Sequence, residues 1–362
     1  MKRLLVFLLL FCLSALLPLG CASFSPSGGG GGDNSQVLSV YNWSTYIDPD
    51  TVREFEEKFG VEVEYDTYES NEDLLAKISP GNPGYDIIVP TGDYVAIMAS
   101  EGLLEPLDRA NIPNLKYVDE KFLDPPFDPG NRYSIPYQWG TIGLGYNIEK
   151  TGGELNSWGD IFEPRFAGKV ALMEDLRATL GVILIYLGYD PNTTNEDEVE
   201  AARDFLIEHQ EVIAAFAPDT GQNLLDQGEV YIAVEWSGDI FQVMEENPDL
   251  RYSIPEEGTI VWTDNLAIPK DAPNKALAEK FINFILEPEV GARISNYVKY
   301  GSPNQAAIDR GLIEQEDLEN PAIYPPPQVF GKLKHADDIG KATELYDDAW
   351  IEVKVALSNS FF

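Results

Sequence analysis

Residues 37–68 read VLSVYNWSTYIDPDTVREFEEKFGVEVEYDTY and alternate between strand and helix patterns. The apolar run 37–43 predicts a strand, and residues 50–59 have the spacing of an amphipathic helix that stops at Gly60. Residues 61–68 predict a second strand. Repeated strand–helix–strand units indicate a mostly parallel sheet covered by helices. This stretch therefore predicts an α/β fold.

The same alternation continues along the rest of the chain. A helix is expected after Asn71, which we interpret as a helix cap together with Asp50. Further strands are expected at 86–90, 143–147, 170–173, 212–217, 230–236 and 260–269. Further helices are expected at 95–100, 178–187, 196–208, 240–246, 275–286, 288–297 and 341–356.

The N-terminus has the pattern of an export signal. Lys2 and Arg3 precede the apolar run 4–19, which is short for a membrane span and ends at Gly20-Cys21. We expect residues 1–20 to be a lipoprotein signal peptide, Cys21 to be lipidated, and 21–36 to be a flexible Gly/Ser tether. The chain is then an extracytoplasmic lipoprotein that touches the membrane only through its anchor. An ordinary cleaved signal, with Cys21 incidental, is the alternative.

Composition and motifs exclude several classes of function. The chain has 61 acidic and 25 basic residues, a net charge of −36, which disfavours nucleic acid and anionic ligands. Its two histidines lack metal-cluster spacing or a Ser-His-Asp context, and no phosphate-binding loop occurs. We expect no enzyme activity, cofactor or metal. A glycosidase with paired carboxylates is the main enzyme alternative.

Aromatic rings and acids gather at the expected ends of strands. The stretches 41–46 (YNWSTY), 235–239 (EWSGD) and 261–264 (VWTD) each carry aromatic rings, and the last two also carry acids. Rings and carboxylates are what an organic cation requires. Open α/β sheets bind ligands beyond the carboxyl ends of their strands. Glu235 alternates with Trp236 and should face the other side, so it is left out of the site.

Several segments resemble a known family. These are YNWSTY at 41–46, YESNE at 68–72, YDIIVP at 85–90, YSIPYQWG at 133–140 and WTDNLAIP at 262–269. They are similar to bacterial extracytoplasmic spermidine/putrescine-binding proteins of polyamine ABC transporters. The resemblance implies a type II periplasmic-binding-protein-like fold, in which crossover strands join two α/β lobes around a ligand cleft. Residues 37–139 and 264–307 would form lobe 1, and 140–263 and 308–362 would form lobe 2.

The resemblance also implies a set of ligand-binding residues. The aromatic box would use Trp43, Tyr46, Trp236 and Trp262, with Ser44 and Thr91 as polar neighbours and Asp175 and Asp264 as ammonium-binding acids. Asp93 replaces a tyrosine of the family, and Asp239 matches an acid of the putrescine-binding branch. Asp175 has a second interpretation as a helix cap.

The predicted function is capture of a polyamine and its delivery to an inner-membrane ABC permease by a monomeric binding protein. Putrescine and spermidine both remain open, because Ala178 and Ala336 replace polar residues of the spermidine-binding branch. The alternatives are a binding protein for a sugar or amino acid on the same fold, and a lipoprotein with structural or adhesive duties.

Overall fold

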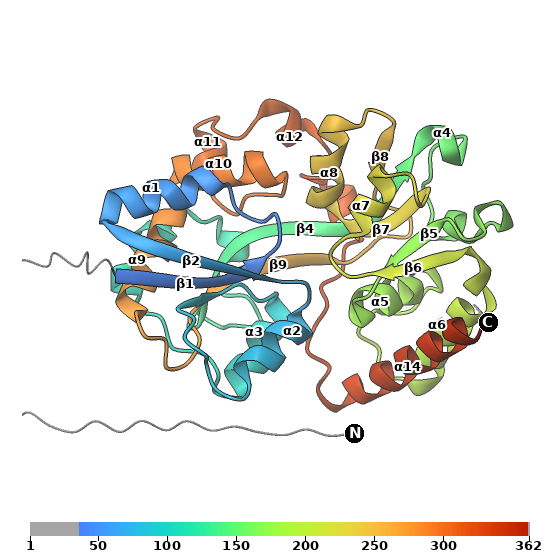
Figure 1. Ribbon diagram of the computed structural model, residues 1–362, viewed down its shortest axis with the longest axis horizontal. Helices are drawn as coiled ribbons and strands as arrows, with labels where there is room; N and C mark the ends of the chain where they lie inside the picture. The colour runs from blue at the N-terminus through green and yellow to red at the C-terminus, as the bar shows by residue number, and fades with distance from the viewer. Residues whose placement is uncertain (1–35, 361–362) are drawn as a thin grey trace, which may run out of the picture. The chain divides into compact units, whose positions relative to one another are not determined.

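The computed structural model describes residues 36–360, and one mixed sheet runs through that segment (Figure 1). Its strands are β1 (Gln36–Trp43), β2 (Val61–Tyr68), β3 (Ile87–Ile88), β4 (Ser134–Asn147), β5 (Val170–Met173), β6 (Ile213–Ala217), β7 (Ile232–Trp236), β8 (Leu250–Ser253) and β9 (Val261–Ala267). The predicted signal peptide, Cys21 and almost all of the tether lie outside the described residues. Gln36, the last residue of the predicted tether, begins β1.

The strands follow the order β2-β1-β3-β9-β4-β7-β5-β6, and β8 pairs with β4. Pairing is parallel at both ends of this order, where β1 pairs with β2 and β3, and β5 pairs with β6 and β7. It is antiparallel in the middle, because β9 pairs with β3 and β4, and β4 pairs with β7 and β8. The prediction of a mostly parallel sheet was therefore wrong for the central strands.

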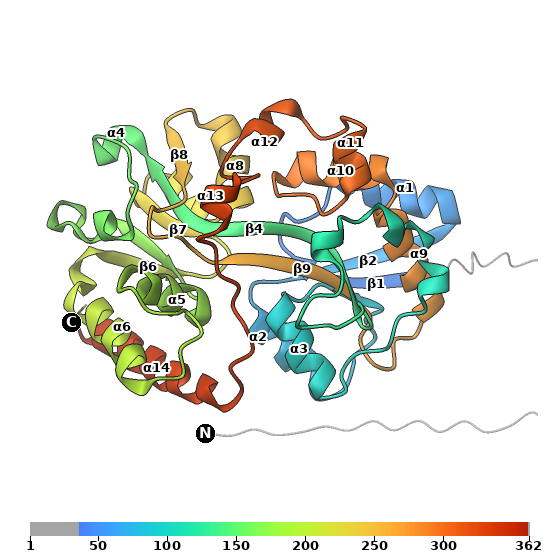
Figure 2. The same ribbon diagram turned by 180° about the vertical axis from the view of Figure 1, so that it is seen from behind.

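Helices cover both faces of this sheet. They are α1 (Pro49–Phe59), α2 (Asn71–Ile78), α3 (Gly92–Ser100), α4 (Ile148–Thr151), α5 (Leu176–Tyr186), α6 (Glu196–Glu208), α7 (Gly221–Asp226), α8 (Ser237–Glu246), α9 (Lys275–Ile285), α10 (Pro288–Val298), α11 (Gln305–Asp309), α12 (Gln315–Glu319), α13 (Pro327–Phe330) and α14 (Thr343–Ser360). In Figures 1 and 2, α1 and α10 lie on one face, and α2 and α3 lie on the other. Within 36–360, no helix has the length and apolar character needed to cross a bilayer.

β4 and β9 run between the two parallel groups of strands (Figure 2). The predicted lobe boundaries, 139/140 and 263/264, fall within these two strands. β4 begins at Ser134, well before the predicted start at 143. The prediction missed its first residues because Pro136 and Gly140 weaken the strand signal in the sequence. The lobe assignment itself stays a prediction.

The helix caps differ from those predicted. Asp48 caps α1, because its side chain accepts from the Asp50 amide 3.0 Å away and Pro49 occupies the first helical position. Ser70 caps α2 by accepting from the Asp73 amide at 3.1 Å. Asp50 is therefore not a cap. Asn71 is buried, and its side chain accepts from the Thr91 amide at 3.2 Å instead.

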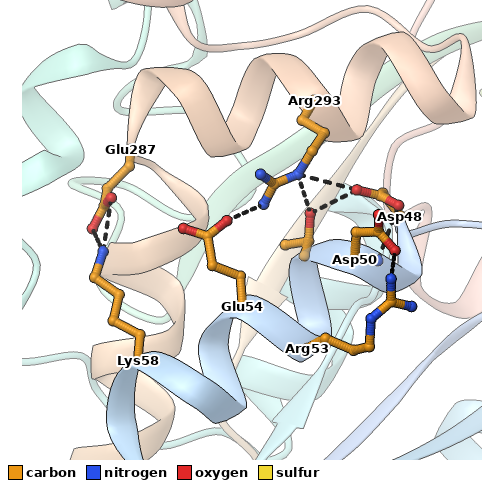
Figure 3. Close-up of polar contacts among 8 residues, drawn as sticks. Asp48, Asp50, Arg53, Glu54, Lys58, Glu287 and Arg293 are labelled. Atoms are coloured by element: carbon orange, nitrogen blue, oxygen red, sulfur yellow. Dashed lines mark hydrogen bonds and ion pairs between the residues drawn. The ribbon is translucent and has the colours of Figure 1, made fainter.

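Charged side chains connect α1 to α10, as Figure 3 shows. Arg293 Nε lies 3.1 Å from Asp48 Oδ2, and Arg293 also contacts Thr51 and Glu54. The Asp48 side chain is only 9% exposed, so Arg293 supplies the charge that a nearly buried carboxylate requires. At the other end of the helix pair, Lys58 and Glu287 are 40% and 34% exposed and stand 2.9 Å apart.

We predict that Arg293→Met destabilises the protein by about 1–3 kcal/mol, because it leaves the Asp48 carboxylate without its cation. Lys58→Met is the matched control. It removes a cation from the same helix pair at a solvated site, so the expected loss is below about 0.5 kcal/mol. Urea denaturation of both variants measures the difference. Equal losses would contradict this account.

Candidate functional site

A small cavity lies where β1, β7 and β9 bring their aromatic residues together. The unfilled space between its walls is about 300 Å³, part of which is open to solvent. Its lining consists of Trp43, Ser44, Tyr46, Thr91, Asp219, Trp236, Asp239, Trp262, Asp264 and Tyr300. Eight of the ten predicted site residues are in this lining. The other two, Asp93 and Asp175, line a larger adjoining cavity that shares Thr91, Trp236 and Trp262 with the small one.

The ends of strands position most of the lining. Trp43 is the last residue of β1, and its indole donates to the Val89 carbonyl at 3.0 Å. Trp236 is the last residue of β7 and precedes α8. Trp262 and Asp264 lie inside β9, and Asp264 forms a β-bridge with Thr91. The antiparallel strand β9 therefore places Trp262 and Asp264 opposite the ends of β1 and β7.

Four of the rings form one contiguous wall. Tyr46 meets Tyr300 edge to face with centroids 5.3 Å apart, and Trp262 lies 5.1 Å from Tyr300. Trp236 meets Trp262 nearly at right angles at 5.6 Å. Such pairs stabilise one another by about 0.5–1.5 kcal/mol beyond their buried area. The wall is consequently held in place by the protein alone.

Two glycines make room for these rings. A Cβ at Gly238 would lie 2.5 Å from the Tyr300 ring, and one at Gly140 would lie 2.7 Å from the Trp262 ring. Real Cβ atoms do not approach this closely, so any larger residue would displace a ring. The glycines thus determine how closely β4 and α8 approach the cavity wall.

Asp264 is buried in this wall without a basic partner. It is 4% exposed, and its Oδ1 has no hydrogen-bond partner among the described residues. Burial raises the pKa of Asp264 well above its usual range, and the nearby Tyr46 hydroxyl opposes this only in part. Trp262 Nε1, which lines the same cavity, also has no hydrogen-bond partner in the described part of the chain, and the Tyr46 hydroxyl has none apart from its interaction with the Asp264 carboxyl group.

The sequence analysis missed two residues of the lining, Asp219 and Tyr300. Asp219 Oδ2 accepts from the Ser44 hydroxyl at 2.6 Å, and the Tyr300 hydroxyl donates to Asp239 Oδ2 at 3.0 Å. Asp219 follows β6, a strand end that could have suggested it. Tyr300 follows α10, so no strand-end signal marks it.

Glu235 stands behind this side of the cavity and is not part of its lining. It is 1% exposed, and its Oε1 accepts from the Trp236 amide at 3.0 Å. Its carboxylate belongs to a group with those of Asp219 and Asp239 in which one oxygen of each lies within 4.8 Å of the others. Oxygen atoms in this arrangement are suited to hard cations or to ammonium groups.

The larger cavity holds the remaining acids of the predicted site. Asp175 caps α5 by accepting from the Ala178 amide at 2.8 Å, and Thr91 donates to Asp93 Oδ1 at 2.6 Å. Burial raises the pKa of both carboxyl groups, while the Arg177 guanidinium acts in the opposite direction. Burial, with a contribution from Asp175, also raises the pKa of Glu72 to about 7. Asp175 thus caps α5, as one interpretation predicted, and it also lines a cavity, as an ammonium-binding acid would.

The two histidines lie apart from the small cavity. His209 stacks on Phe205 with centroids 4.2 Å apart, and its Nδ1 is 2.8 Å from the Phe205 carbonyl oxygen. His335 lines the larger cavity, and burial lowers its pKa. Neither has the Ser and Asp neighbours of a hydrolytic triad among the hydrogen bonds of residues 36–360.

Comparison with known proteins places this geometry in a family. Residues 50–323 match the family of bacterial extracellular solute-binding proteins, and the chain belongs to that family. The spermidine/putrescine-binding periplasmic protein of Salmonella typhimurium is 35% identical over 341 residues, which cover 94% of this chain and 97% of that protein. The putrescine-binding periplasmic protein of Escherichia coli K12 is 35% identical over 342 residues, covering 88% of this chain and 91% of that protein.

A solved structure from Listeria monocytogenes, provisionally named a spermidine/putrescine ABC transporter, shares the fold. It superposes with a TM-score of 0.84 at 38% identity and covers 88% of this chain and 99% of its own. The resemblance proposed from the sequence is thereby confirmed, as is the type II periplasmic-binding-protein-like fold class.

The packing of the ring wall predicts the effect of enlarging Gly238. We expect Gly238→Ala to destabilise the protein by about 1–3 kcal/mol despite the higher helix propensity of alanine, because the new methyl group overlaps the Tyr300 ring. Gly153→Ala is the control, since a Cβ there meets no atom within 4 Å and should change stability by less than about 1 kcal/mol. Urea denaturation distinguishes the two. A stabilised Gly238→Ala protein would refute the close packing.

The buried acids predict that the ligand-free protein becomes less stable as pH rises. Burial raises the pKa of Glu235 to about 8 and that of Asp239 to about 7. The folded chain therefore binds more protons than the unfolded chain between about pH 4.5 and 8, so its stability is highest at the acid end and falls across this window. Thermal unfolding of polyamine-free protein from pH 5 to 8.5 at constant ionic strength measures this. A rising or constant midpoint would contradict it.

Proposed function

We propose that this protein captures a polyamine in the small cavity and delivers it to an ABC permease. The observation that carries the proposal is the position of Asp264, a buried carboxylate in an aromatic wall with an unpartnered oxygen. A buried charge of this kind is unfavourable until a cation and further hydrogen bonds satisfy it. The ligand's ammonium group would supply both.

The chemistry of the lining suits a polyamine better than other small solutes. The faces of Trp236, Trp262 and the neighbouring tyrosines offer apolar contacts to methylene groups and cation–π contacts of about 0.5–2 kcal/mol to ammonium groups. Neutral sugars would leave the buried acids without a countercharge. Amino acids would bring a carboxylate into a cavity that already holds Asp219, Asp239 and Asp264.

The family comparison supports the same conclusion. The relatives with about one third identity over most of this chain are named for binding spermidine and putrescine, and they are named as binding proteins and not as enzymes. Micromolar affinity corresponds to about −8 kcal/mol, which a few ring contacts and two ammonium–carboxylate pairs can provide after the entropy losses of binding.

The remaining parts of the proposal concern place and partners. We infer an extracytoplasmic protein that is anchored through a lipid on Cys21, acts as a monomer and presents its bound polyamine to an inner-membrane permease. Closure of the two lobes around the ligand would create the surface that the permease recognises. The N-terminal sequence pattern and the periplasmic location named for the relatives support this. Palmitate labelling of the Cys21→Ser variant tests the anchor.

Isothermal titration of the purified protein with putrescine, cadaverine, spermidine and spermine tests the function directly. We expect micromolar or tighter binding of at least one polyamine. Asp264→Asn keeps the shape of the side chain and removes its charge, so we predict a loss of about 2–5 kcal/mol in binding free energy.

Asp197→Asn serves as the control, because it removes the same charge from an exposed position in the first turn of α6. It should bind polyamine like the unmodified protein. Unchanged affinity in a folded Asp264→Asn protein would remove Asp264 from the site. Failure of every polyamine to bind would overturn the proposed function.

A further inference from the structure

Lys299, the residue that ends α10, has an unusual backbone conformation. Its φ is 59° and its ψ is 27°, in the left-handed region that glycine most often occupies at the end of a helix. A lysine is less favourable there, because its Cβ comes close to a backbone carbonyl oxygen. The residue is also only 8% exposed. Strained and buried positions of this kind persist where strong surrounding contacts hold them, so the contacts of Lys299 are informative.

Three carboxylates surround the Lys299 ammonium. Its Nζ lies 3.0 Å from Glu245, 2.8 Å from Glu314 and 3.4 Å from Asp317. In the part of the chain that the structure describes, no other basic side chain forms an ion pair with any of these acids. Burial acts to lower the pKa of Lys299, but the three acids together raise it above its usual value. One charged ammonium therefore holds three carboxylates together.

These acids approach the ammonium from two different helices. Glu245 belongs to α8, whereas the Glu314 amide donates to the Asn296 side chain of α10 at 3.0 Å. The pair of Lys299 with Glu314 thus stays on the side of α10, and the pair with Glu245 connects α10 to α8. Both helices lie on the same side of β4 (Figures 1 and 2).

The residues next to Lys299 contact the same helix. Three residues of α8, spaced three apart and therefore on one face of the helix, contact three consecutive residues at the end of α10. The pairs are Asp239 with Tyr300, Gln242 with Val298 and Glu245 with Lys299. The first two are hydrogen bonds of 3.0 Å, donated by the Tyr300 hydroxyl and by the Gln242 side-chain amide. The ion pair is thus one of three adjacent contacts that fix this segment to α8.

Tyr300 connects this helix contact to the small cavity. Its ring lines the cavity, 5.1 Å from the Trp262 ring and 5.3 Å from the Tyr46 ring. Lys299 is not part of the lining. An effect of Lys299 on a bound ligand must therefore pass through the residues that it holds in place, of which Tyr300 is its neighbour in the chain.

We propose that Lys299 is a positioning residue of the binding site. Its ion pair with Glu245 holds the end of α10 against α8 and so keeps the Tyr300 hydroxyl bonded to Asp239 in the cavity wall. Without the ammonium, Glu245 would face the acids beside α10 with no cation between them, and their repulsion would separate the two helices. This proposal rests on the proposed function, because Tyr300 can act on a ligand only if the small cavity receives one.

Titration calorimetry with putrescine tests the proposal on variants of the full chain. Lys299→Met keeps the length of the side chain and removes its charge, so it should weaken binding about tenfold. Glu245→Gln removes only the partner on α8 and should weaken binding about two- to fivefold. Glu314→Gln is the matched control, because it removes a partner of the same ammonium at similar exposure, 54% against 60%, on the side of α10. It should change the affinity less than about twofold.

A double-mutant cycle determines whether Lys299 acts through Tyr300. Tyr300→Phe keeps the ring and removes the hydroxyl that donates to Asp239. If Lys299 holds this hydroxyl in place, Lys299→Met should weaken putrescine binding less than about twofold in the Tyr300→Phe background. Urea denaturation of the same four proteins without ligand should also be non-additive. A lysine with only a structural role would lower stability in both backgrounds alike.

Additive losses of affinity in this cycle would overturn the proposal, and so would equal losses in Glu245→Gln and Glu314→Gln. If Lys299→Met does not fold, Glu245→Gln replaces it in the cycle, since the Glu245 side chain is largely exposed. If no polyamine binds to the unmodified protein, the proposed function fails. The cycle measured by urea denaturation then still decides the role of Lys299, and additivity there would refute it.

Discussion

Buried carboxyl groups without basic partners are the feature on which the site depends. Removing a carboxylate from water is unfavourable by several kcal/mol unless a cation or a proton compensates it. Elsewhere the chain pairs some buried acids with cations, since Arg293 contacts Asp48 and Lys299 lies 3.4 Å from Asp317. It satisfies others, such as Asp128 and Glu279, with backbone amide donors. Around the small cavity it leaves acids in contact only with hydroxyl, amide and ring groups. In the ligand-free protein, protons can compensate these acids, because burial raises the pKa values of Asp264 and Asp239. A ligand that brings a cation can take the place of such a proton.

The two central strands make this arrangement possible. β4 and β9 pair antiparallel along their length, so a residue inside a strand can stand opposite the ends of the parallel strands on either side. Trp262 and Asp264 occupy such positions, and Gly140 on β4 leaves space for the indole. Rings from β1, β7 and β9 meet only because these crossings bring distant segments together.

The sequence allowed much of the cavity lining to be predicted, and the exceptions have physical reasons. Trp43 and Trp236 were predicted because each ends a strand, and the apolar residues of β1 and β7 make both strands recognisable in the sequence. Tyr300 was missed because it follows a helix, and its place in the cavity depends on the absence of a side chain at Gly238. The mixed direction of the central strands was missed because residue patterns report burial and not strand direction. The predicted caps, Asp50 and Asn71, lie two residues and one residue after the observed caps, Asp48 and Ser70. The error arose because neighbouring polar residues can all act as caps.

The distribution of positive charge separates the two cavities. In the larger one, the Arg177 guanidinium lowers the pKa of Asp93 and Asp175 against the effect of burial, so part of the countercharge is already present in the protein. In the small one, burial raises the pKa values of Asp264, Asp219, Glu235 and Asp239, and the other groups that act on these carboxyls are acids, hydroxyls and backbone amides. The overall charge of −36 attracts cations to the whole surface, but it does not select among them. Selection of one organic cation requires a carboxylate without a basic partner next to an apolar wall. Within residues 36–360, Asp264 and the rings of Tyr46, Trp262 and Tyr300 provide this combination at the small cavity.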